Sequence, residues 1–341
     1  MRPFDYVRPT SLGEAVGLLD GNGDSRLLAG GTDLLTLMKA DLATPDRLVD
    51  LKRLPELDDA IAPTDDGGLR VGALATLGQI EDHPLIVQPY RALAEAAALA
   101  ATPQLRNMAT IGGNLLQRPR CWYYRNPHVS CWLKGGSDCP AREGDNRYHA
   151  LFGDAPCVAV HPSDPATALI ALDATVDVAG PAGERVIPVG ELFALPGGNR
   201  RTETILGANE VITAVTLPPR PANAGSAYLK AMDRKVWAFA TVAVAASLAI
   251  EDGVVRDARL VLGGVAPIPW TVPDAAALLV GNVAGKDLFA RVADTALEGA
   301  HPLAHNGYKA PLLKALIRRA LAAVATPSEA GERDAGTSFP V

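Results

Sequence analysis

The chain has 341 residues, of which 48% are hydrophobic and 21% are charged, with a formal net charge of −6. This length allows two or three domains, and the composition is typical of an ordinary globular core. The negative charge and the lack of a basic block argue against nucleic acid as a partner. No uncharged apolar run reaches the ~18 residues of a membrane span, so none is predicted.

The N-terminal segment MRPFDYVRPTS has no apolar h-region, so the chain is predicted to carry no secretion signal of its own. We therefore expect it in the cytoplasm, or in the periplasm by co-export with a partner that carries the signal. Ser11–Leu19 has a capping residue and one apolar face, which predicts a short helix. Strands are predicted at 26–29 and 47–51, with a helix after Asp33 between them, as in a β-α-β unit.

The segment LLAGGTDL reads as a strand, a glycine turn and the start of a helix. Its two glycines permit positive φ and close backbone approach. Thr32 or Asp33 is the expected N-cap, and the following helix start would offer unpaired N–H groups to an anion. The candidate ligand contacts are Leu27, Leu28, Ala29, Gly30, Gly31, Thr32, Asp33 and Leu34.

A turn cluster at 63–68 predicts a boundary between two lobes, and a strand at 69–72 opens the second. An alanine-rich helix at 92–101 then leads to a second glycine pair within ATIGGN. A glycine pair alone is also typical of an ordinary turn. Two such segments favour a dinucleotide with a pyrophosphate, although neither has Rossmann or P-loop spacing. The candidate contacts here are Thr110, Gly112, Gly113 and Asn114.

All four cysteines of the chain lie in one window, at Cys121, Cys131, Cys139 and Cys157. Their spacing is more open than that of a zinc ribbon or a ferredoxin run. From the residues alone three interpretations stay open: ligands of a [4Fe–4S] cluster, ligands of structural zinc, or two disulfides in an oxidising compartment. For His128 and His149 in the same window, we expect surface or hydrogen-bonding roles.

After this window, periodicity predicts a helix at 166–172 and strands at 175–179, 187–192 and 206–217 that complete the sheet of the second lobe. A third unit follows, with strands at 241–250 and 256–263 joined by an Asp-Gly hairpin turn. Two amphipathic helices are predicted at 286–297 and 308–324, which gives an α+β layer. Residues 327–341 have the composition of a loose tail.

Three motifs in order, LLAGGTDLL, ATIGGN and HPSD, resemble the FAD-binding (medium) subunit of the xanthine dehydrogenase family of molybdenum hydroxylases. The resemblance covers nearly the whole chain and implies an α+β fold. A two-lobed FAD-binding domain of the PCMH or vanillyl-alcohol-oxidase type would span 1–221, with lobes at about 1–62 and 63–221. A C-terminal domain like that of the CO dehydrogenase flavoprotein would span 222–326, with a three-stranded antiparallel sheet and helices.

The resemblance also implies a non-covalent FAD. The first glycine segment would wrap its pyrophosphate, the second would line the flavin, and Asp164 would hydrogen-bond the cofactor. Leu206 lies where the family commonly packs a leucine near the flavin, and Lys230 is a further candidate to approach the flavin or its phosphates. On sequence alone, a core leucine and a surface lysine are the simpler interpretations. His161 is expected to be a structural histidine.

A subset of this family carries a cysteine insert, here at about 117–158, that binds a [4Fe–4S] cluster. QRPRCWYYRN, GGSDCPAREGDNRYHA and CVAVHPSD resemble the insert of periplasmic aldehyde oxidoreductases. The resemblance, more than the spacing, therefore favours the four cysteines as cluster ligands over zinc or disulfides.

The chain has no Ser/His/Asp or Cys/His arrangement and no molybdopterin motif, so no catalytic residue is predicted. The resemblance implies an electron-transfer subunit of a heterotrimer. A [2Fe–2S] small subunit would pass electrons through FAD to a small-molecule or protein acceptor, while a molybdopterin-binding large subunit oxidises an aldehyde. Two other classes stay open: a stand-alone flavin oxidase, and a zinc-stabilised assembly module without redox chemistry.

Overall fold

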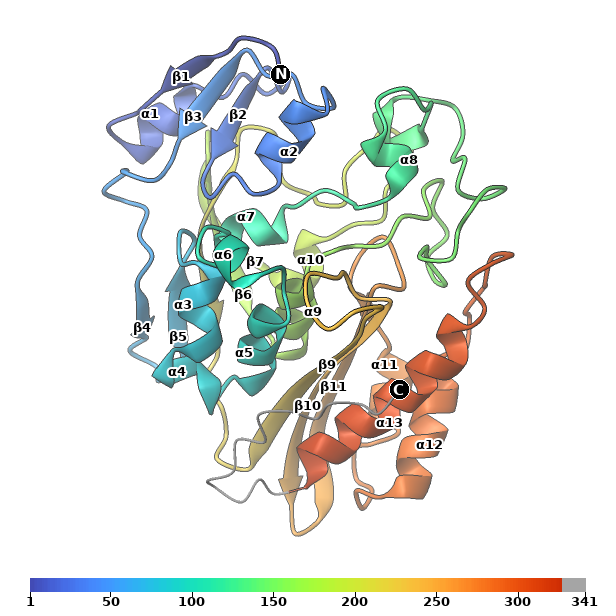
Figure 1. The fold of residues 1–341 in the computed structure, drawn as a ribbon. Coiled ribbons are helices and arrows are strands. Elements are labelled where there is room, and N and C mark those ends of the chain that lie inside the picture. Colours follow the sequence, from blue (N-terminus) through green and yellow to red (C-terminus); the bar gives the residue numbers. More distant parts are fainter. Residues whose placement is uncertain (327–341) are drawn as a thin grey trace.

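The computed structural model describes residues 1–326, and the predicted tail at 327–341 lies outside them. The described residues form three sheets, with strand orders β1-β3-β2, β4-β5-β8-β6-β7 and β12-β11-β10-β9. Figure 1 shows the first sheet at one end of the molecule and the other two following it, with helices packed around them. No helix in this part of the chain has the length and apolar character needed to cross a bilayer.

The first lobe is a parallel three-stranded sheet. Parallel neighbours need crossover connections, which two short helices supply. The predicted β-α-β unit is present, and the N-terminal strand β1 extends it. The elements are β1 (Asp5–Val7), α1 (Leu12–Gly17), β2 (Ser25–Leu28), α2 (Leu34–Lys39) and β3 (Arg47–Asp50).

The second lobe is an antiparallel five-stranded sheet covered by helices. Its strands are β4 (Ile61–Pro63), β5 (Leu69–Gly72), β6 (Thr175–Gly180), β7 (Gly183–Pro188) and β8 (Val211–Leu217). Its helices are α3 (Leu77–Asp82), α4 (Pro84–Val87), α5 (Arg91–Ala98), α6 (Pro103–Arg106), α7 (Ile111–Leu115), α9 (Asp164–Ala171) and α10 (Val189–Leu192).

Two predicted strands of this lobe have wrong bounds. The strand predicted at 187–192 ends at Pro188, and the next four residues form α10, which buries Val189 and Leu192 on one helical face. The strand predicted at 206–217 starts only at Val211. The residues before it turn, because the Glu210 carboxylate accepts the N–H of Gly207 at 2.8 Å.

The C-terminal unit contains the predicted antiparallel sheet of three long strands, and the two-residue β12 extends it at one edge. Alternate residues of β10 face opposite cores: Val242 and Val244 pack against the C-terminal helices, whereas Ala243 and Ala245 belong to the core of the second lobe. The elements are β9 (Ala224–Ala231), β10 (Val242–Glu251), β11 (Val254–Gly263), β12 (Trp270–Thr271), α11 (Pro273–Ala277), α12 (Lys286–Thr295) and α13 (Lys309–Ala325).

The cysteine insert has little regular structure, only α8 (Trp122–Arg125) and a 3₁₀ turn, η1 (Trp132–Lys134). The first residue of α13, Lys309, holds it against the C-terminal unit. Its fully buried Nζ donates to the carbonyls of His149 (2.9 Å) and Gly264 (2.6 Å). Burial lowers the pKa of this ammonium group to about 7. A lysine in this setting joins the insert to α13.

Lys309→Met should destabilise the protein by about 2–4 kcal/mol, because the substitution keeps the apolar stem and leaves buried carbonyl groups without their donor. Urea-induced unfolding monitored by circular dichroism measures this loss. Lys314→Met is the matched control on the same helix, since the Lys314 ammonium is exposed and pairs with the exposed Asp294. Equal stability of the two variants would contradict the role given to Lys309.

Candidate cofactor site

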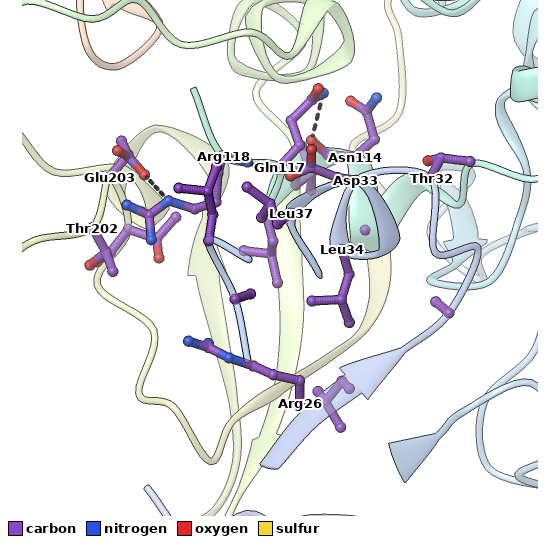
Figure 2. Close-up of a pocket in the computed structure, with 18 of the residues that line it drawn as sticks. Arg26, Thr32, Asp33, Leu34, Leu37, Asn114, Gln117, Arg118, Thr202 and Glu203 are labelled. Atoms are coloured by element: carbon purple, nitrogen blue, oxygen red, sulfur yellow. Dashed lines mark hydrogen bonds and ion pairs between the residues drawn. The ribbon is translucent and has the colours of Figure 1, made fainter. Parts of the chain in front are cut away.

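A cavity of about 980 Å³ lies where the two glycine segments meet. Figure 2 shows Thr32 and Asn114 on the opposite side of this site from Arg118, Thr202 and Glu203. Most of the predicted contacts line the cavity: Leu27, Ala29, Gly30, Gly31, Thr32, Asp33, Leu34, Thr110, Gly112, Gly113, Asn114 and Leu206. Three predicted contacts are absent from the lining: Leu28, which packs in the core of the first lobe, Asp164 and Lys230.

The glycines act through their missing side chains. A Cβ on Gly30 would lie 1.8 Å from the carbonyl oxygen of Met108, so only glycine lets the two segments touch here. Gly31 has φ +70°, in the left-handed region that glycine favours. A Cβ on Gly113 would meet only Thr110 Oγ1, at 3.0 Å, and otherwise enter open space. Gly113 therefore leaves bare main chain at the cavity wall.

Hydrogen bonds fix the polar groups of the second segment. Thr110 caps α7 by accepting the N–H of Gly113 at 3.2 Å. Ser163, the cap of α9, donates its hydroxyl to Asn114 Oδ1 at 2.6 Å. Because that oxygen is occupied, the Asn114 amide keeps its Nδ2 as a donor for a ligand in the cavity.

Asp33 is at the N-cap position of α2, but its carboxylate does not cap that helix. It binds the entry of the insert instead. Oδ2 accepts the backbone N–H of Arg118 at 2.8 Å, and Oδ1 accepts Arg125 Nη2 at 2.8 Å and pairs with Arg120 Nη2 at 2.9 Å. One carboxylate thus joins the first glycine segment to three residues of the insert.

Asp164 and Lys230 form a buried ion pair with each other, at 2.7 Å. Asp164 also accepts the Tyr228 hydroxyl at 2.5 Å, and Lys230 also donates to the carbonyl of Leu99 at 2.9 Å. Burial, and then the charge of Asp164, raise the pKa of Tyr228 well above its usual value. The structure therefore gives both groups protein partners that tie α9 to β9, and their contact with a cofactor stays a prediction.

Arg118, Arg120 and Glu203 form a wall of the cavity that the sequence analysis missed. Arg118 Nε lies 3.2 Å from Glu203 Oε2. Burial raises the pKa of Glu203, against the opposing effect of Arg118, and burial lowers the pKa of Arg120 to about 10. Among the described residues, Glu203 Oε1 and Arg120 Nε are buried without a hydrogen-bond partner. Orphaned polar atoms at a cavity wall are the groups that a polar ligand satisfies.

All four cysteines are free thiols. Cys131 and Cys157 are buried in one cluster with Tyr124 and Trp132. Backbone N–H groups favour the thiolate form at each sulfur: those of Tyr123 and Tyr124 act on Cys121, those of Leu133 and Lys134 on Cys131, those of Ala141 and Val158 on Cys139, and that of Ala159, which donates to Cys157 Sγ at 3.4 Å, on Cys157. Such N–H donors stabilise negative charge on sulfur.

The thiols also affect one another's pKa values. A hydrogen bond from Cys157 lowers the pKa of Cys139, and the same contact raises that of Cys157. Burial raises the pKa of Cys121 to about 11, and charges on Cys131 and Cys139 add to this effect. Within residues 1–326, no three His, Cys, Asp or Glu side chains converge as ligands of a single metal ion.

His161 also lines the cavity, and its side chain is buried. Its ring packs edge-on against Phe193 at 4.6 Å, and its Nδ1 accepts the backbone N–H of Ser163 at 3.3 Å. Burial lowers its pKa to about 3. The ring therefore stays neutral and supports the segment that caps α9.

A family profile described as "FAD binding domain in molybdopterin dehydrogenase" matches residues 2–220, and one described as "CO dehydrogenase flavoprotein C-terminal domain" matches residues 227–324. The chain belongs to the FAD-binding subunits of the molybdenum hydroxylase family. The family resemblance carried by the three sequence motifs is thereby confirmed.

Two curated relatives in this family match the chain almost end to end. The chain is 40% identical to "Aldehyde oxidoreductase FAD-binding subunit PaoB" of Escherichia coli K12, over 94% of this chain and 98% of that protein. It is 30% identical to the carbon monoxide dehydrogenase medium chain of Hydrogenophaga pseudoflava, over 93% and 96%. A solved carbon monoxide dehydrogenase from the same organism superposes with a TM-score of 0.75 at 29% identity, covering 95% of this chain and 97% of that one.

The position of Asp33 in this FAD-binding subunit predicts a stability effect that spreads into the insert. Asp33→Ala should destabilise the fold by about 2–3 kcal/mol, somewhat below the cost of breaking a fully buried pair, because these charges keep some solvent contact. It should also speed proteolysis within 117–158, since the entry of the insert loses its anchor. Thermal unfolding and mass spectrometry of tryptic fragments measure the two effects.

Asp46→Ala is the control for this prediction, since Asp46 is an exposed aspartate of the same lobe. Cleavage that remains as slow in Asp33→Ala as in the control would show that the insert does not depend on this carboxylate.

Proposed function

We propose that the chain is the FAD- and [4Fe–4S]-carrying electron-transfer subunit of a heterotrimeric, molybdenum-dependent aldehyde oxidoreductase. A [2Fe–2S] subunit would deliver electrons, FAD would collect two of them, and an external acceptor would remove them. The proposal is carried by one observation: Cys131 of the insert and both glycine segments line the same cavity. A redox centre bound by the cysteines would then lie beside a cofactor bound by the glycines.

The cavity fits a dinucleotide in size and chemistry. Its volume is at the upper end of the range for small-molecule sites, about 300–1,000 Å³. The first glycine segment, with Gly31, would wrap the pyrophosphate, the bare main chain at Gly113 would line the flavin, and Asn114 Nδ2 would donate to the ligand. Leu206 supplies an apolar contact at the wall. When bound, FAD supplies the two-electron redox chemistry, and these residues position it.

The insert supports a cluster more than a single metal ion. Four cysteine thiolates are the usual ligands of a [4Fe–4S] centre, and backbone N–H groups and aromatic side chains surround these four. All four thiols are close enough for the charge of one to affect the pKa of another, as the effects of Cys131 and Cys139 on Cys121 and of Cys121 on Cys157 indicate. Cys121, Cys131, Cys139 and Cys157 are the proposed ligands.

The proposal of aldehyde oxidation rests on the 40% identity to the subunit named for aldehyde oxidoreductase. This chain matches that subunit over nearly its full length. The substrate would react on a molybdopterin-binding large subunit, since the relatives are subunits of molybdenum hydroxylases. Turnover of an aldehyde by the isolated chain would favour a stand-alone flavin oxidase instead. We further propose that the chain works in the periplasm if its partners export it, and otherwise in the cytoplasm.

Gly113→Val should lower FAD content at least tenfold while the fold is kept. The new side chain enters the cavity, and only the hydroxyl of Thr110 has to move to make room for it. Flavin absorbance per chain after desalting, with circular dichroism as the check on folding, measures this. Gly13→Val in α1, where a Cβ meets nothing within 4 Å, is the control. Full flavin content in Gly113→Val would place the cofactor elsewhere.

Cys131→Ser should remove most iron and acid-labile sulfide from anaerobically purified protein and leave FAD largely bound. A serine oxygen is a poor substitute for a thiolate ligand. Ser137→Ala, an exposed change in the same insert, should keep the metal. Metal analysis of the unmodified chain decides between the readings: zinc, or no metal, would overturn the cluster.

A further inference from the structure

His149 lies in the insert with its imidazole against a cysteine. The side chain is only 3% exposed, and its Nε2 lies 3.2 Å from Cys121 Sγ. The rings of Trp122 and Tyr123 flank it, with centroid distances of 6.3 and 6.2 Å. The imidazole is therefore held in place with one nitrogen facing the sulfur.

The main chain of His149 is fixed from two sides. Its N–H donates to the carbonyl of Asn146 at 2.9 Å within the insert. Its carbonyl accepts Asn306 Nδ2 at 3.1 Å, from the loop before α13, and Lys309 Nζ at 2.9 Å, from the first residue of α13. The C-terminal unit thus determines where this imidazole lies relative to Cys121.

The two ring nitrogens have different surroundings. Nδ1 is buried and has no hydrogen-bond partner in the described part of the chain, whereas Nε2 faces sulfur. A neutral imidazole carries one N–H, and the proton is best placed on the nitrogen that has an acceptor. This arrangement makes Nε2 the donor and Cys121 Sγ the acceptor.

We propose that His149 donates a hydrogen bond to the Cys121 thiolate when that thiolate ligates the cluster, and that this bond raises the reduction potential of the cluster. The inference rests on the cluster of the proposed function and assigns one residue that sets its potential. Within residues 1–326, Cys121 is the one proposed ligand with an imidazole at hydrogen-bond distance.

The direction of the effect follows from charge. Reduction adds an electron to the cluster and increases the negative charge on its ligand sulfurs. A donor aimed at such a sulfur binds the reduced form more strongly than the oxidised form, so it favours reduction. Backbone N–H groups act on all four sulfurs, whereas the imidazole adds a side-chain donor at Cys121 that a substitution can remove.

The test compares His149→Phe with His149→Gln in the full chain loaded with FAD. Phenylalanine keeps a ring of similar size without a donor, whereas glutamine retains an N–H at similar reach. In His149→Phe, the reduced cluster should lose about tenfold in stability relative to the oxidised form, which lowers the reduction potential by about 59 mV for a one-electron couple. In His149→Gln, the reduction potential should be lowered by less. His301→Phe, an exposed histidine, is the control.

Potentials are measured by redox titration with electron paramagnetic resonance, alongside iron and sulfide content per chain. Electron spin echo modulation of the reduced unmodified protein should show imidazole nitrogen, and both His149 variants should lack that signal. If His149→Phe does not bind iron, the potential is measured in His149→Gln instead. Loss of iron from His149→Gln as well would count against the hydrogen-bond role.

Two failures are distinguishable. An unchanged potential in His149→Phe with full iron content overturns this inference and leaves the proposed function standing. An unmodified chain without iron overturns the cluster itself, and this inference with it.

Discussion

One close approach of two main-chain segments determines the shape of the site. Gly30 of the first lobe meets the carbonyl of Met108 of the second lobe at a distance that excludes any Cβ. The two lobes have separate sheets, so no shared strand aligns them here. Because Met108 stands just before Thr110, this contact brings both glycine segments to the same cavity. The cavity therefore lies between the two glycine segments, beside the contact of Gly30 with Met108.

The insert depends on charged donors rather than on regular secondary structure. Its carbonyl groups need partners that helices or strands would normally supply. Guanidinium and ammonium groups provide them, since an arginine carries five N–H donors. These bonds run from Arg125 to Pro119 and Arg118, from Lys134 to Tyr123 and Asn126, from Arg142 to Ala155, and from Arg201 to Trp132 and Gly136. Asp33 then holds the entry of the insert against the first glycine segment, which couples the cysteines to the cavity.

The sequence predicted the parts of this site that have a local signature. Both glycine segments, the fold and the family follow from short motifs, and the long strands of the C-terminal sheet follow from alternation. The pairing of Asp33 with Arg118 and Arg125 spans 85 and 92 residues, so no local pattern reveals it. The same holds for Arg120 and Glu203, which look like ordinary surface charges in the sequence. The burial of Lys230 against Asp164 was missed for the same reason, because a lysine in a strand gives no sign of its partner.

Within residues 1–326, the C-terminal unit contributes no residue to the cavity lining, yet several contacts connect it to the site, among them Phe239 against Arg120 and the two routes that follow. In the first, Lys230 of β9 pairs with Asp164 in the first turn of α9, and Ser163, which caps that helix, holds Asn114 at the cavity. In the second, Lys309 at the start of α13 binds the carbonyl of His149, whose ring meets Cys121. Because β10 is buried on both faces, this unit cannot shift without disturbing the core of the second lobe. A domain outside the cavity thus helps to position both Asn114 at the cavity and the His149 ring beside Cys121.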